Sequence, residues 1–224
     1  MHNEPQEIKF IATPEKGEVS ALLIRPDHAK HLLVLGHGAS SNMRTPLLTN
    51  LAEHLAEAGI ATFRYNFPYS EKGGGRNSNT TCIETIRSAV AAGRTSAPDL
   101  PLLAGGHSFS GRMTSTAQSE APLDGVEGLV FFSFPLHPAG KSGIERADHL
   151  FSIDIPMLFL SGTRDDLATL DLLEHVAMKL GSNATLHLLD TADHSFKIQK
   201  TKRATNEDVF DEIARTVSDW MKVL

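Results

Sequence analysis

Short, mostly apolar runs recur along the chain and alternate with segments whose apolar residues follow a helical spacing. Continuous runs such as His31–Leu35 and Val126–Phe134 are typical of strands buried on both faces of a sheet. Two earlier segments, joined across Pro14–Gly17, predict an antiparallel hairpin. The predicted strands are Glu7–Thr13, Glu18–Arg25, His31–Leu35, Ile60–Phe67, the run that follows Pro101, Val126–Phe134, Ile155–Leu160 and Thr185–Leu189.

The helical segments each have one apolar face and, in several cases, a sequence signal at an end. Thr45 and Pro46 suit the N-cap and the first position of a helix that Gly59 ends. The other predicted helices are Thr80–Arg94, one opening at Ser110, Thr169–Leu180, and Asn206–Val223 with Thr205 as its cap.

This alternation predicts an α/β fold with a mostly parallel central sheet of about eight strands and helices on both faces. The first hairpin is expected to be antiparallel. We find no linker or internal repeat and expect one domain spanning residues 1–224. Because chemistry in such sheets lies at the carboxyl ends of the strands, four polar groups are expected along one edge. They are Gly36–Ser40, Ser108, Asp165 and Asp190–His194.

The stretch around Ser108 has the layout of a nucleophile elbow. An apolar strand ends in Gly105 and Gly106, Ser108 follows, and a helix opens next. The sharp turn requires small residues two positions before and after the nucleophile, and these are Gly106 and Ser110. Ser110 replaces the usual glycine. It is also a rival nucleophile, but the same steric test disfavours it because Arg112 would then stand two positions later.

A serine hydroxyl needs a base, and the base needs a carboxylate that orients it. In chain order, Ser108 is followed by Asp165 after one buried strand and by His194 after the last strand. This is the serine–acid–histidine order of the α/β-hydrolase fold, which predicts these three residues as the catalytic triad. Asp166 is the rival acid, although it is also suited to capping the next helix. Asp190 and Asp193, close to His194, are expected to form turns.

The tetrahedral intermediate of acyl transfer needs two donors for its oxyanion. We expect one to be the backbone N–H of Phe109, directly after the nucleophile. The other is expected from the loop after the third strand, where Ala39 follows His37 and Gly38.

Three segments carry a more specific resemblance: Arg64–Pro68, Gly105–Arg112 and Phe134–Lys141. With them the chain, from about Val19 to Trp220, resembles the dienelactone-hydrolase-like branch of the α/β-hydrolase superfamily. It is most similar there to the testis-expressed, KANL-type subfamily and its small bacterial relatives. Dienelactone hydrolases use a cysteine nucleophile, so the serine found here does not imply their particular activity.

The segment between the strands that end near Phe134 and begin near Ile155 is too short for a helical lid domain. We therefore expect an open substrate pocket. Its predicted lining is His37, Asn66, Leu136, His137 and the Gly73–Gly75 loop.

The composition narrows the possible partners. A net charge of −6 gives no basic surface for nucleic acid. No histidine pair has zinc spacing and Gly73–Gly75 lacks the phosphate-binding context, so neither metal nor cofactor is expected.

The single cysteine, Cys82, excludes an internal disulfide and is expected to pack in a helix. Met1–Phe10 lack a signal-peptide pattern, and no apolar run reaches the roughly 20 residues of a membrane span. We expect a cytoplasmic protein with no membrane association.

Together these features predict a serine hydrolase that acts on small carboxylic esters or thioesters, with a small molecule as its partner. A catalytically idle scaffold that binds a protein or a small ligand is the alternative, and a peptidase could use the same triad. The natural substrate and the oligomeric state stay open.

Overall fold

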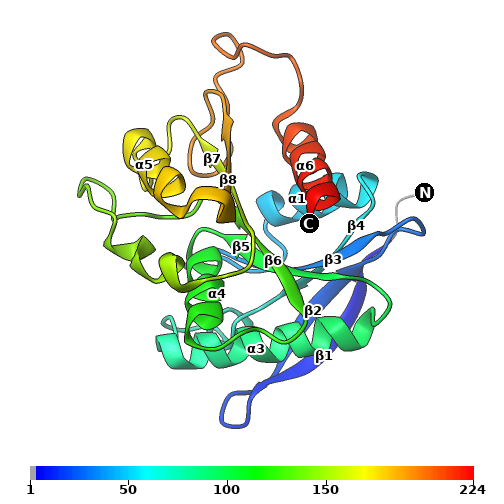
Figure 1. Ribbon diagram of the computed structural model, residues 1–224. Coiled ribbons are helices and arrows are strands. Elements are labelled where there is room, and N and C mark those ends of the chain that lie inside the picture. Colours follow the sequence, from blue (N-terminus) through cyan, green and yellow to red (C-terminus); the bar gives the residue numbers. More distant parts are fainter. Residues whose placement is uncertain (1–3) are drawn as a thin grey trace.

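The computed structural model describes residues 4–224, which are built around an eight-stranded sheet (Figure 1). The strands are β1 (Gln6–Thr13), β2 (Gly17–Ile24), β3 (His31–Gly36), β4 (Ile60–Tyr65), β5 (Leu102–His107), β6 (Val126–Phe132), β7 (Met157–Gly162) and β8 (Ala184–Leu189). Their order in space is β1-β2-β4-β3-β5-β6-β7-β8. The β1/β2 and β2/β4 pairs are antiparallel, and all other neighbours are parallel. The predicted sheet, with its antiparallel first hairpin, is confirmed.

Helices cover both faces of this sheet, as expected (Figure 1). They are α1 (Pro46–Glu57), α2 (Pro68–Lys72), α3 (Asn79–Ser96), α4 (Phe109–Glu120), α5 (Leu170–Leu180) and α6 (Val209–Trp220), with 3₁₀ segments η1 (Glu145–Ser152), η2 (Gly181–Asn183) and η3 (Met221–Val223). No helix within residues 4–224 is long and apolar enough to cross a membrane.

Alternation along the strands divides the core into two layers. In β3, Leu33 and Leu35 pack with Leu51 of α1 and with α6, while Leu32 and Val34 pack on the opposite side with α3. Successive side chains of a strand point to opposite faces, so an uninterrupted apolar run is buried on both. The two layers hold the strand ends, and the loops that follow them, in a fixed arrangement.

Some element boundaries differ from the prediction for local reasons. Strand β6 ends at Phe132 rather than Phe134, because Ser133 has a φ of 57° and turns the chain out of the sheet. Helix α6 begins at Val209 because Asp208, not Thr205, accepts the N–H of Phe210 at 2.8 Å. The short helix α2 precedes the Gly73–Gly75 loop, where the sequence predicts no helix.

The connection between β6 and β7, residues 133–156, contains η1 as its one regular element. It carries no helical lid, as the sequence predicted, and the carboxyl edge of the sheet is left open.

Candidate active site

Ser108 forms the sharp turn between β5 and α4. Its backbone has φ 53° and ψ −112°, a conformation that residues with a side chain rarely adopt. The Ser108 N–H donates to the carbonyl oxygen of Phe132 at 2.9 Å, and the N–H of Arg112 donates to the carbonyl oxygen of Ser108 at 3.2 Å. These bonds hold a strained turn of the kind that raises a nucleophile above its strand.

The elbow is so crowded that Gly106 cannot carry a side chain. A Cβ there would lie 2.1 Å from Ser110 Oγ and 2.6 Å from the carbonyl oxygen of Gly36. Ser110 is fully buried, and its Oγ donates to the carbonyl oxygen of His107 at 3.2 Å. Its side chain fills the space left open by Gly36 and Gly106, which explains how the turn accepts serine in place of glycine. Burial also keeps this hydroxyl away from any substrate.

The structure brings Ser108, His194 and Asp165 into one hydrogen-bonded chain. His194 Nδ1 donates to Asp165 Oδ1 at 2.9 Å and Oδ2 at 2.8 Å. On the other side of the ring, His194 Nε2 accepts from Ser108 Oγ at 2.8 Å. The Asp165 side chain is 0% exposed and that of His194 is 21% exposed. The carboxylate is therefore shielded from water while the imidazole and the hydroxyl remain accessible.

Two loops at the carboxyl edge place the acid beside the histidine. Asp165 follows β7, and its Oδ1 also accepts the N–H of Leu167 at 2.8 Å, which fixes the carboxylate. The N–H of Arg164 donates to the carbonyl oxygen of Ala192 at 2.9 Å and joins this loop to the one after β8. Asp166 is exposed and caps no helix, since the N-cap of α5 is Thr169.

His107 supports the histidine loop, a role that the sequence did not reveal. Its Nε2 donates to the carbonyl oxygen of His194 at 2.9 Å. Burial lowers the pKa of His107 to about 4, so the ring is neutral near pH 7. Asp193 forms the predicted turn, because its Oδ1 accepts the N–H groups of Ser195 at 2.8 Å and Lys197 at 3.0 Å.

A cavity of about 360 Å³ lies next to the Ser108 hydroxyl. Its lining comes from the loop after β3, the start of α1 and the loops after β7 and β8: Gly38, Ala39, Ser40, Ser41, Thr45, Leu47, Leu48, His107, Ser108, Leu167, His194 and Ser195. Ala39, the residue predicted as an oxyanion donor, therefore borders the cavity. Phe109 is the first residue of α4, where the helix itself leaves the backbone N–H groups without acceptors.

Four side chains predicted to line the substrate pocket do not border this cavity. All four are 8% exposed or less: His37, Asn66, Leu136 and His137. Each packs in the interior of the protein. Asn66, for example, accepts the N–H of Met43 at 2.9 Å, and His37 Nε2 accepts the N–H of Phe67 at 3.3 Å. Burial lowers the pKa of His37 to about 4.

His137 and the Gly73–Gly75 loop likewise lie away from the cavity. His137 Nε2 accepts the N–H of Thr169 at 3.1 Å and its Nδ1 donates to the carbonyl oxygen of Pro138 at 3.0 Å, so the ring ties its segment to α5. The Gly73–Gly75 loop is exposed, and a Cβ at any of its glycines would meet no atom within 4 Å. It does not border the cavity either.

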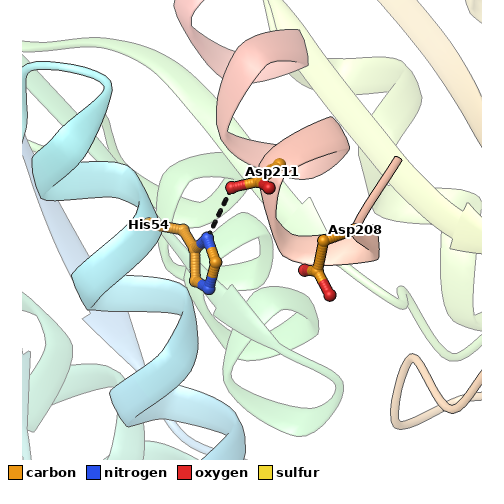
Figure 2. A group of neighbouring side chains, drawn as sticks. All are labelled: His54, Asp208 and Asp211. Atoms are coloured by element: carbon orange, nitrogen blue, oxygen red, sulfur yellow. Dashed lines mark hydrogen bonds and ion pairs between the residues drawn. The ribbon is translucent and has the colours of Figure 1, made fainter. Parts of the chain in front are cut away.

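A second group of side chains, where α1 meets α6, has donor atoms suited to a metal ion (Figure 2). His54, Asp208 and Asp211 each offer one ligand atom, and these atoms lie within 4.8 Å of one another. They already have structural partners, however. His54 Nδ1 donates to Asp211 Oδ1 at 2.7 Å, and Asp208 caps α6 through the N–H of Phe210. The group is explained by the contact between α1 and α6.

Comparison with known proteins agrees with the geometry of the sheet and elbow. Residues 29–222 match the model of a family described as an alpha/beta hydrolase domain. The chain belongs to this α/β-hydrolase family.

Solved structures with the same fold include a dienelactone hydrolase from Anabaena variabilis, with a TM-score of 0.74 at 20% identity over 98% of both chains. An alpha-beta serine hydrolase homologue from Coxiella burnetii has a TM-score of 0.74 at 18% identity, covering 99% of this chain and 98% of that one. A serine hydrolase without a lid from Xanthomonas campestris has a TM-score of 0.72 at 18% identity, covering 100% of this chain and 96% of that one. At these identities the likeness establishes the fold, and the dienelactone-hydrolase-like resemblance is confirmed at that level.

Proposed function

We propose that this hydrolase is serine-dependent and cleaves small carboxylic esters or thioesters through an acyl-enzyme intermediate. The observation that carries the proposal is the 2.8 Å contact between Ser108 Oγ and the Nε2 of a histidine whose Nδ1 binds a buried carboxylate. A hydroxyl in this position can lose its proton to the imidazole as it attacks a carbonyl carbon.

The reaction would follow from the arrangement of these groups. Ser108 Oγ attacks the carbonyl and passes its proton to His194, while Asp165 keeps the imidazole in the required tautomer and stabilises its charged form. The backbone N–H groups of Phe109 and Ala39 receive the developing oxyanion. His194 then protonates the leaving alcohol or thiol, and a water molecule repeats the sequence to release the acid.

Hydrolysis of a short p-nitrophenyl ester by the wild type and by Ser108→Ala tests the proposal. We expect a loss of kcat on the order of ten-thousandfold or more, because a triad acts as a unit. The rate should also rise with pH, since only neutral imidazole accepts the serine proton. Equal rates for the two proteins, or a rate independent of pH, would contradict the mechanism.

Two other functions are separated by simple measurements. A fluorophosphonate probe labels only an activated serine, so labelling that disappears in Ser108→Ala argues against an idle scaffold. An ester compared with the matching amide distinguishes an esterase from a peptidase, and the open cavity with its apolar Leu47, Leu48 and Leu167 favours the ester.

A further inference from the structure

Three arginines near the elbow differ from the other arginines in the polar partners of their guanidinium groups. The sequence has eleven arginines, and eight of them have polar partners in the structure. Carboxylates pair with Arg25, Arg44, Arg94, Arg203 and Arg215, while Arg64, Arg87 and Arg164 donate to carbonyl oxygens. Within residues 4–224, no carboxylate or carbonyl oxygen binds the guanidinium groups of Arg76, Arg112 and Arg146.

Two of these side chains lie close to the elbow. The guanidinium of Arg76 lies over the ring of Phe109, 5.0 Å from its centroid, and Phe109 is the residue after the nucleophile. Arg112 stands four residues after Ser108, and positions so spaced share one face of a helix. Helical side chains lean toward the N-terminus, so that of Arg112 leans toward the end of α4 that carries Ser108.

Arg146 joins this pair through the packing of η1 on α4. His149 Nε2 donates to Ser115 Oγ at 2.7 Å and fastens η1 to the helix, with Arg146 three residues before His149. Burial lowers the pKa of Arg112, and the positive charges of Arg146 and Arg76 lower it further. The three guanidinium groups therefore share one neighbourhood beside the nucleophile.

An anion bound among these groups would be stabilised by all three positive charges. Like charges repel, and desolvation of a half-buried guanidinium has a cost that no internal carboxylate offsets here. In a chain with a net charge of −6, the surface offers many acidic residues as partners, yet none binds these three. The planar guanidinium fork matches a carboxylate in bidentate geometry, which makes arginine the usual residue for this ligand.

We propose that Arg76, Arg112 and Arg146 bind a carboxylate of the substrate, so that the preferred esters are anionic. The proposal rests on the hydrolase function proposed above. The cavity with Leu47, Leu48 and Leu167 is lined partly from α1, on the face of the sheet opposite α3 and α4 (Figure 1). A substrate that extends across Ser108 thus has an apolar part in the cavity and a charged part on the arginines.

Two matched pairs of esters test the charge preference on either side of the scissile bond. p-Nitrophenyl hydrogen glutarate is compared with p-nitrophenyl valerate, and para-acetoxybenzoate with its methyl ester. In at least one pair, wild type should favour the anionic member about ten- to a hundredfold in kcat/KM, chiefly through KM. Added salt should reduce the preference. No preference in either pair overturns the proposal.

The arginine variants identify the groups responsible. Arg112→Gln and Arg76→Gln should each lower kcat/KM of the preferred anionic ester about tenfold more than that of its neutral partner. Arg112→Lys should retain part of the preference because it keeps the charge. Arg94→Gln removes the same charge at a remote pair with Asp124 and should leave the ratio unchanged.

A purely structural role for Arg112 predicts a different pattern. In that case Arg112→Gln would lower Tm and reduce the two members of a pair equally. Our proposal predicts an equal or higher Tm, because the substitution relieves repulsion with Arg76 and Arg146.

Binding to Ser108→Ala separates this proposal from the hydrolase function. Calorimetric titration with p-nitrophenyl hydrogen glutarate should show binding that weakens about tenfold in the Ser108→Ala, Arg112→Gln double variant. Hydrolysis without any preference for anionic esters would support the hydrolase function and contradict the arginine site. Arginine-dependent binding without hydrolysis by the wild type would support the arginine site and contradict the hydrolase function.

Discussion

Two histidine–aspartate pairs in this protein have similar hydrogen bonds but different surroundings. His194 Nδ1 lies 2.8 Å from Asp165 Oδ2, and His54 Nδ1 lies 2.7 Å from Asp211 Oδ1 (Figure 2). The Asp165 side chain is 0% exposed, whereas that of Asp211 is 55% exposed. The remaining ring nitrogen of His194 meets Ser108 Oγ, while the ring of His54 stacks on Phe210 at a centroid distance of 5.6 Å.

The comparison shows that a histidine–carboxylate contact alone does not make a catalytic pair. A buried carboxylate has few alternative partners, so it fixes the tautomer of its histidine. An exposed carboxylate exchanges its bond with water and contributes little. The strand-end loops supply both burial and the third group, and the surface contact between α1 and α6 supplies neither.

Removing the buried carboxylate should have the largest effect. We expect Asp165→Asn to lower kcat about a thousand- to ten-thousandfold, because the imidazole can then adopt the wrong tautomer. Ester hydrolysis with circular dichroism as a check of folding measures this. Asp166→Asn changes the exposed neighbour and serves as the control, and a similar loss in both would refute the assignment of the acid.

A third histidine–carboxylate pair is intermediate in exposure between these two. Breaking it should affect the stability of the protein rather than its activity. His187 Nε2 donates to Glu212 Oε1 at 2.8 Å, and Glu212 also pairs with Arg203, whose side chain is 1% exposed. Glu212→Ala should lower the free energy of unfolding by about 3 kcal/mol, since it leaves a buried charge without its partner.

Urea unfolding measures this loss. Glu207→Ala, which breaks the exposed pair with Arg215, should lower the free energy of unfolding by less than about 1 kcal/mol. Equal effects of the two substitutions would show that burial of the Arg203 pair does not matter.

A half-buried histidine without a carboxylate partner should make stability depend on pH. Burial, and then the charge of Arg112, lowers the pKa of His149 from 6.5 to about 4. The unfolded chain therefore takes up this proton more readily, so the stabilisation is complete above pH 6.5 and is lost as pH falls toward 4.

His149→Gln should consequently show a smaller loss of stability over this range than wild type, as measured by urea unfolding at several pH values. An identical pH dependence in the two proteins would show that this ring does not contribute.

The exposed pair should show the smallest effect. Asp211→Asn should change the free energy of unfolding by less than about 1 kcal/mol and leave ester hydrolysis within twofold of wild type, because water replaces the lost partner. A loss of activity comparable to that of Asp165→Asn would remove the distinction between the two pairs.

The sequence was a good guide wherever a local pattern reports a local requirement. Apolar runs located the strands, and the spacing of glycines around Ser108 located the elbow. Asp165 and His194 each follow a later strand of the sheet. Their positions predicted that they lie near Ser108, because the carboxyl ends of parallel strands are at the same edge of a sheet. Element ends were less predictable, as at Asp208, since competing caps differ by small energies.

Burial near the site was less predictable. Chain order singled out His194, but no local pattern showed that His37 and His137 are buried. The bond from His107 to the carbonyl oxygen of His194 likewise joins positions 87 residues apart. Which side chain covers another depends on how separate loops stack, and no single segment encodes that.

The sequence by itself determined the alternating strands and helices, the small residues of the elbow, and the chain order of serine, acid and histidine. These depend on steric and hydrophobic requirements that each segment meets within a few residues. The tertiary structure alone decided which of three histidine–carboxylate pairs faces a hydroxyl, which polar residues border the cavity, and which three arginines have no carboxylate or carbonyl partner within residues 4–224. Those outcomes depend on desolvation and on distances between distant segments, and both quantities exist only once the sheet has assembled.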